Sequence, residues 1–122
     1  MANIFLDTNY LIFLSGKENL PTLHALKDHT AFISTLTVHI YYYVLKIQVP
    51  DTPSLEFLRE YNIVDFTHEV LERSLFGPTN DLGDNVQLHS AVRANCDYFV
   101  TQNKKLLGMK YFGKMKVVSQ IP

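Results

Sequence analysis

Short apolar runs alternate along the chain with longer stretches in which apolar residues recur at helical spacing. The runs are rich in β-branched and aromatic residues and predict strands over 3–6, 31–34, 63–66, 98–101 and 117–121. The stretches between them predict helices over 11–14, 22–27, 38–47, 53–60, 68–74 and 84–94. Because parallel strands need a crossover between them, this alternation predicts an α/β fold, a three-layer α/β/α sandwich with a central parallel sheet of about five strands.

Several local signals mark where the helices begin. Thr52 stands before Pro53 and is expected to cap one helix, while Thr67 is expected to cap the next. Residues 77–83 are the only concentrated cluster of turn-forming residues, and they lead directly into the helix predicted over 84–94. No repeat or linker divides the chain, so we expect residues 1–122 to form one domain.

The composition supports a compact domain in a reducing environment. The chain has 122 residues, of which 47% are hydrophobic, and a formal net charge of −1. The single cysteine, Cys96, excludes an intramolecular disulfide and leaves no second thiol for a structural zinc site. No window approaches the roughly 18 apolar residues that a membrane helix needs, so we expect a soluble, cytoplasmic protein without membrane contact.

The small net charge conceals an uneven distribution. Residues 1–97 hold 6 basic and 12 acidic side chains, whereas 98–122 hold five lysines and no acid. A basic segment of this kind is either one side of a polyanion-binding surface or a solvated face. Both interpretations stay open for Lys104, Lys105, Lys110, Lys114 and Lys116.

Three groups of polar residues stand where an open parallel sheet binds its ligands, just after strands or at a helix start. Asp7 ends the first strand and either caps the following helix or takes part in a site. Asp81 and Asp84 precede the helix over 84–94; one is expected to cap it, and the other is left for a hard cation. Asn103 and Thr101 follow the fourth strand, where Asn103 is either a turn residue or a neutral ligand and Thr101 could hold a metal-bound water.

Taken in order, these segments resemble the PIN-domain ribonucleases. The resemblance lies in the apolar strand that ends in Asp7, Thr8 and Asn9, in residues 81–91, and in residues 95–103. It spans almost the whole chain, and it rests on the order and spacing of the segments. It implies a parallel sheet with an acidic pocket at its carboxyl edge that binds Mg²⁺ or Mn²⁺ and cleaves RNA.

The resemblance also implies roles for individual residues. Asp7, Asp84 and Asn103 would be metal ligands, with Asp81 and Thr101 as supporting catalytic residues. Lys104, Lys105 and Lys110 would contact RNA phosphates without reading sequence. Small members of the family are most often toxins held inactive by an antitoxin protein, and family habit together with the aromatic segment 41–44 suggests a homodimer.

One family position departs from the pattern. The family usually has Glu at the start of the helix after the second strand, and the aligned residue here is Ile40, beside His39. An aliphatic side chain cannot bind a metal, so the alternative to a nuclease is a PIN-fold module with a degraded site that binds RNA or a protein. A haloacid dehalogenase-like phosphatase is a lesser alternative. It is weaker because the general acid of that family is an Asp, and Asn9 stands at that position here.

Overall fold

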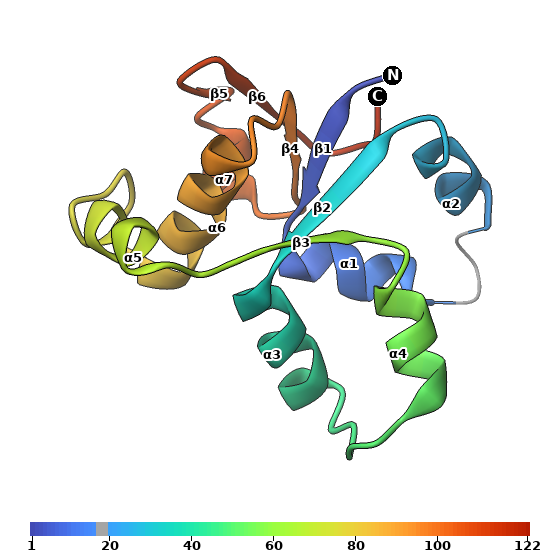
Figure 1. Ribbon diagram of the computed structural model, residues 1–122. Coiled ribbons are helices and arrows are strands. Elements are labelled where there is room, and N and C mark those ends of the chain that lie inside the picture. Colours follow the sequence, from blue (N-terminus) through green and yellow to red (C-terminus); the bar gives the residue numbers. More distant parts are fainter. Residues whose placement is uncertain (17–19) are drawn as a thin grey trace.

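The protein is described by a computed structural model over residues 1–16 and 20–122 (Figure 1). Strands and helices alternate along the chain as the hydrophobic pattern predicts. In chain order the elements are β1 (Asn3–Leu6), α1 (Thr8–Leu14), α2 (Leu20–Leu26), β2 (Thr30–Ser34), α3 (Thr35–Val44), α4 (Thr52–Leu58), β3 (Asn62–Val64), α5 (His68–Leu75), α6 (Leu82–Arg93), β4 (Tyr98–Val100), α7 (Lys104–Leu107), β5 (Tyr111–Phe112) and β6 (Met115–Val118).

The strands form one sheet in the order β3-β2-β1-β4-β6-β5. All neighbours pair in parallel except β5, which is antiparallel to β6. The predicted parallel sheet is therefore confirmed, but the expected number of about five strands is one short. The additional strand, β5, has two residues and turns into β6 through Gly113, whose φ of 61° lies in the left-handed region. A run of two residues is too short to show a strand period.

Alternation along the strands builds a separate core on each face of the sheet. Ile4 and Leu6 of β1 pack toward a core that includes residues of α1, α3 and α4. Phe5, between them in sequence, points to the other face and stacks on Phe99 of β4, with ring centroids 5.5 Å apart. Leu88 of α6 completes that second core. In Figure 1, α5, α6 and α7 lie on one side of the sheet and α1, α2 and α4 on the other, which confirms the three-layer sandwich.

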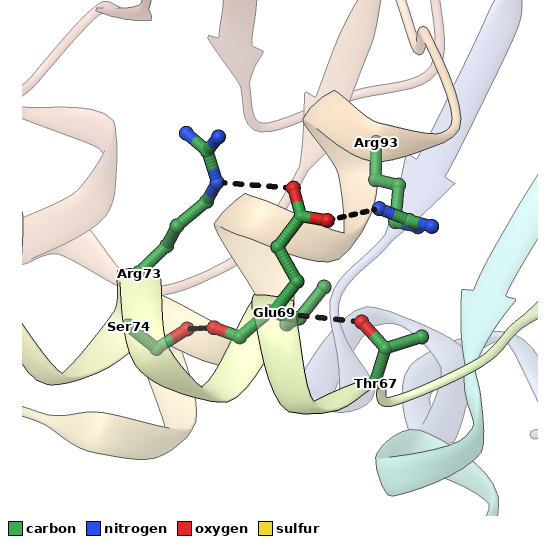
Figure 2. A network of polar contacts seen from close by, with 6 residues as sticks. Thr67, Glu69, Arg73, Ser74 and Arg93 are labelled. Carbon is green, nitrogen blue, oxygen red and sulfur yellow. Dashed lines mark hydrogen bonds and ion pairs between the residues drawn. The ribbon is translucent and has the colours of Figure 1, made fainter.

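Most helices begin one to three residues before the predicted start, α1 at Thr8 and α3 at Thr35, and one of the two expected caps is shifted. Thr67 caps α5 as predicted, because its hydroxyl accepts from the Val70 amide at 3.2 Å (Figure 2). Helix α4 begins one residue earlier than expected, since Asp51 instead of Thr52 is the cap and accepts from the Ser54 amide at 3.0 Å. A carboxylate is as good a cap as a hydroxyl, so the sequence Asp-Thr-Pro offered two candidates.

Helix α5 is held against α6 by an ion-pair network at the surface. Glu69 of α5 pairs with Arg73 of the same helix at 3.3 Å and with Arg93 of α6 at 3.2 Å (Figure 2). All three side chains are about half exposed or more, so the network orients the two helices more than it stabilises them. Among the described helices, none is long and apolar enough to cross a membrane.

Candidate active site

The topology brings Asp7 and Thr101 together at the carboxyl edge of the sheet. Strands β1 and β4 are parallel neighbours in which Leu6 pairs with Val100, so the residues that follow them lie side by side. The Thr101 hydroxyl donates to Oδ2 of Asp7 at 2.8 Å, and the Thr8 amide donates to Oδ1 at 2.9 Å. Asp7 therefore caps α1, as one of its two interpretations expects, and it also faces Thr101.

Burial and hydrogen bonding act on the Asp7 carboxylate in opposite directions. Its side chain is 5% exposed, and this loss of hydration raises its pKa above the ordinary range. The hydrogen bonds from Thr101 and Thr8 favour the charged form and limit that rise. Asp7 is thus a buried carboxyl group whose ionised form depends on its donors.

One member of the pair Asp81 and Asp84 caps α6, as expected. Oδ1 of Asp81 accepts from the Asp84 amide at 3.0 Å, which makes Asp81 the cap of α6. Asp84 lies in the first turn and is half-buried. Desolvation, followed by the charges of Asp81 and Asp7, raises the pKa of Asp84 to about 6, while Lys105 opposes the shift. The three carboxylates are therefore close enough to repel one another.

Asn103 lies near Asp84 and Thr101. It is the residue before α7, a four-residue helix that the sequence did not predict. Its Oδ1 accepts from the Lys105 amide at 2.9 Å, so it caps that helix. Its Nδ2 donates to Oδ2 of Asp84 at 3.4 Å, and its backbone amide donates to the Thr101 hydroxyl at 3.0 Å. Asn103 thus links the end of β4, through its backbone amide, to the start of α6, through its side chain.

A pocket of about 340 Å³ lies between these elements. Asp7, Asp81 and Asp84 all line it, and Ile40 of α3 lines it with them. Ile40, which the family resemblance aligns with the usual Glu, therefore lies in the same pocket as the carboxylates. The remaining lining residues are Thr8, Asn9, Ile12, Gly83 and Gln87.

The sequence analysis missed a buried polar network beneath this pocket. Gln87 of α6 is 3% exposed and donates to the hydroxyls of Thr8 at 2.8 Å and of Thr37. Its Oε1 accepts from the Ser34 hydroxyl. Gln87 follows Asp84 by about one helical turn, and that spacing was the available signal.

The donor set suits a hard divalent cation that keeps part of its water shell. Carboxylate oxygens are the ligands that Mg²⁺ and Mn²⁺ prefer, and a nearby cation would relieve the repulsion that raises the Asp84 pKa. Among the described residues, no group of three or more His, Cys, Asp or Glu side chains converges on one point. Mg²⁺ is commonly held by one or two carboxylates with waters in the other positions, which fits this pocket.

The five C-terminal lysines fall into distinct places. Lys104 and Lys105 are exposed on α7 next to Asn103, and Lys105 is close enough to influence Asp84. Lys110 is exposed after α7. Lys114 and Lys116 instead line a cavity with Met1 and Ala2, at the amino ends of the strands.

Comparison with known proteins shows similarity in structure but not in sequence. No family model matches the chain, and no curated protein sequence matches it significantly. A chain of the VapBC2 structure from Rickettsia felis, solved bound to a DNA fragment from its promoter, superposes with a TM-score of 0.65 at 19% identity, covering 94% of this chain and 96% of that one. VapC20 of Mycobacterium tuberculosis, described as a Sarcin-Ricin loop cleaving toxin, superposes with a TM-score of 0.63 at 11% identity, covering 93% and 98%. The chain therefore has the PIN-domain fold of the VapC proteins.

Proposed function

We propose that this chain is a metal-dependent endoribonuclease that hydrolyses RNA phosphodiester bonds. The observation that carries the proposal is the meeting of Asp7 and Asp84, which are 77 positions apart in the chain, in one pocket at the carboxyl edge of the sheet. One protein of the same fold, VapC20, is described as a toxin that cleaves the Sarcin-Ricin loop.

In this proposal Asp7 and Asp84 hold Mg²⁺ or Mn²⁺. A bound divalent cation neutralises charge at the scissile phosphate and lowers the pKa of a water molecule. Thr101 keeps Asp7 in its ionised form through the hydrogen bond at 2.8 Å. Asp81 is exposed to solvent and also lines the pocket, so it adds a third negative charge at the mouth of the pocket.

Asn103 has a different role in this arrangement from that of a direct ligand. Its oxygen is engaged in capping α7 and its amide nitrogen faces Asp84. An N–H group cannot bind a cation, so we propose that Asn103 orients the Asp84 carboxylate and reaches a metal through water. Lys104 and Lys105, which follow it, and Lys110 provide the cationic contacts to RNA phosphates.

We also propose a small antitoxin as the protein partner. A groove of about 760 Å³ runs between α3, α4 and β3 and is lined mostly by apolar side chains. Val49, Leu55 and Ile63 in its walls are 77%, 44% and 49% exposed, which is unusual for large apolar residues unless another surface covers them. A homodimer through α3 is a separate proposal, supported by Tyr43, which is 78% exposed, while Tyr41 is buried in the core.

A binding module without catalysis is the second candidate. The observation that favours it is Ile40, which lines the pocket where the family resemblance implies a carboxylate. The phosphatase alternative gains no such support, because Asn9 holds the backbone amide of Gln102 through its oxygen at 3.2 Å and supplies no acid.

Cleavage of a mixed RNA pool tests the proposal. Purified protein is incubated with Mg²⁺, with Mn²⁺ or with EDTA, and the Asp84→Asn variant is treated in parallel to reveal contaminating nuclease. We expect cleavage with metal that EDTA and the substitution both remove. Folded protein that cuts in none of these conditions, yet binds RNA, would support the binding module instead.

A further inference from the structure

Asn85 is a polar side chain in the interior that the proposed reaction does not use. It lies in the first half of α6, is 2% exposed, and is not among the residues that line the pocket. Its Nδ2 donates to the backbone oxygens of Ser74 at 2.8 Å and Thr79 at 2.9 Å. Its Oδ1 accepts from the Thr79 amide at 2.9 Å and from the Thr79 hydroxyl at 2.7 Å. Every hydrogen-bonding position of this amide is occupied.

All of these partners belong to the end of α5 or to the loop that joins α5 to α6. One turn further along α6, Nε2 of His89 donates to the backbone oxygen of Gly77 in the same loop at 2.9 Å. Two side chains on one face of α6 thus fasten residues 77–79 to the helix. We call Asn85 and His89 together the loop clamp.

The clamped loop leads directly into the acidic site. The Thr79 hydroxyl, which donates to Asn85, also accepts from the Asp81 amide at 3.1 Å. Asp81 in turn caps α6 through the Asp84 amide and lines the pocket. A chain of hydrogen bonds therefore runs from Asn85 through Thr79 to the two residues at the start of α6.

We propose that Asn85 is a positioning residue for the carboxylate site: it fixes the loop that places Asp81 beside Asp84. This proposal rests on the proposed function, because it assigns Asn85 a role in metal binding and catalysis. Asn85 itself touches neither the pocket nor a substrate, so it acts only through Thr79 and Asp81. The Asn85 amide is suited to this role because it supplies two donors and an acceptor to backbone groups at the end of α5 and in the loop that follows it.

Residues that hold metal ligands in place affect how tightly the metal binds, and Asn85 would act on Asp81 and Asp84 in this way. Removing such a partner typically lowers metal affinity or activity by about 10-fold to 100-fold. The lysines on α7 do not depend on this loop, so binding of the RNA backbone should be preserved. Loss of the clamp is therefore expected to lower kcat and metal affinity while leaving KM unchanged.

The test compares Asn85→Ala with Ser90→Ala. Ser90 lies on the same helix and is equally buried, but its hydroxyl has no hydrogen-bond partner within the described part of the chain, so its loss leaves the loop intact. We measure hydrogen exchange at the amides of Thr79 and Asp81, the Mn²⁺ affinity by electron paramagnetic resonance, and kcat and KM for RNA. In Asn85→Ala we expect at least about 10-fold faster exchange at both amides, about 10-fold weaker Mn²⁺ binding and a lower kcat at constant KM. Ser90→Ala should match the wild type in all of these.

A second variant keeps the test decisive if Asn85→Ala does not fold. Thr79→Val removes the hydroxyl link from the loop side without altering α6, and the backbone amide of residue 79 keeps its bond to Asn85. It should therefore speed exchange at the Asp81 amide, weaken Mn²⁺ binding and lower kcat, with exchange at the amide of residue 79 little changed. A wild-type protein that binds Mn²⁺ and cleaves RNA, with both variants equal to Ser90→Ala, overturns the positioning role alone. A wild-type protein that neither binds Mn²⁺ nor cleaves RNA overturns the proposed function, and the role of Asn85 in it.

Discussion

The Thr101 hydroxyl donates to the Asp7 carboxylate at 2.8 Å, although the two residues are 94 positions apart in the chain. The bond exists because β1 and β4 are parallel neighbours that end at the same edge of the sheet. It links the first and fourth strands at the point where we propose that metal and RNA bind. Its energetic role is to favour the charged form of a carboxyl group whose burial raises its pKa.

Thr101→Val removes this donor while keeping the shape of the side chain. A hydrogen bond to a carboxylate favours its charged form. Without it the pKa of Asp7 should rise further, and the acid limb of the pH profile of kcat/KM should move to higher pH. Thr101→Ser, which keeps the hydroxyl, is the control and should leave the profile in place. Identical pH profiles for Thr101→Val and Thr101→Ser would contradict this role of the Thr101 hydroxyl.

Ile40→Glu should restore a carboxylate to the pocket. Because Ile40 already lines the pocket with Asp7 and Asp84, the new side chain needs no change of fold to reach a cation. We expect Mn²⁺ binding, measured by calorimetry, to tighten about 10-fold, since each added negative ligand offsets the cost of removing water from the ion. Ile40→Gln has the same length without the charge and should not tighten binding. If the Glu and Gln variants bind Mn²⁺ equally, Ile40 does not face the metal.

Asp84→Asn should change how stability depends on pH. The folded-state pKa of Asp84 is about 6, above its ordinary value of 3.8, so the folded protein holds this proton more tightly than the unfolded chain. The stability contributed by the protonated form is complete below about pH 4 and is lost as the pH rises through 6. The variant lacks this loss, so its free energy of unfolding should exceed that of the wild type by about 1 kcal/mol at pH 7 and by little at pH 4, after allowance for solvent screening.

Urea unfolding at the two pH values measures this difference directly. Added Mn²⁺ should stabilise the wild type at pH 7 more than the variant, because an ion bound only by the folded state shifts the equilibrium toward it. A variant that is less stable than the wild type at pH 7 would show that Asp84 forms favourable interactions that outweigh its repulsion from Asp7 and Asp81.

The lysines on α7 should carry part of the affinity for RNA. Replacing Lys104 and Lys105 together by Gln should weaken binding and lower the slope of log affinity against log salt by up to about 1.4, if each contacts one phosphate of single-stranded RNA. The matched control replaces Lys114 and Lys116, which are at the amino edge of the sheet. Fluorescence anisotropy over a salt series gives both slopes, and an equal loss in the two variants would point to a general charge effect.

The sequence predicts the parallel sheet well because its central strands β1, β2 and β4 are mostly buried and read as continuous apolar runs. Asp7 and Thr101 could be placed for the same reason, since residues that end parallel strands meet at one edge. The short elements β5 and α7 could not, because two and four residues are too few to show a period. The capping role of Asn103 follows from α7 and was missed with it.

Other parts of the site depend on contacts between distant segments. Gln87 meets Ser34 from 53 positions away and Thr8 from 79. Asn85 lies in a helical stretch where its neighbours predict only a solvated or core position, and its partners are backbone groups of a loop. Backbone groups carry no sequence signal, so the loop clamp could be found only in the structure.

The central claim is that Asp7 belongs to a metal-dependent ribonuclease site. Single-turnover cleavage of an end-labelled RNA in Mn²⁺ by the wild type and by Asp7→Asn, with melting temperatures measured on the same preparations, tests it most directly. We expect cleavage by the wild type and a loss of about 100-fold or more in Asp7→Asn, whose melting temperature should be equal or higher because a buried carboxylate is replaced by a neutral amide. Equal cleavage by the two folded proteins would contradict it.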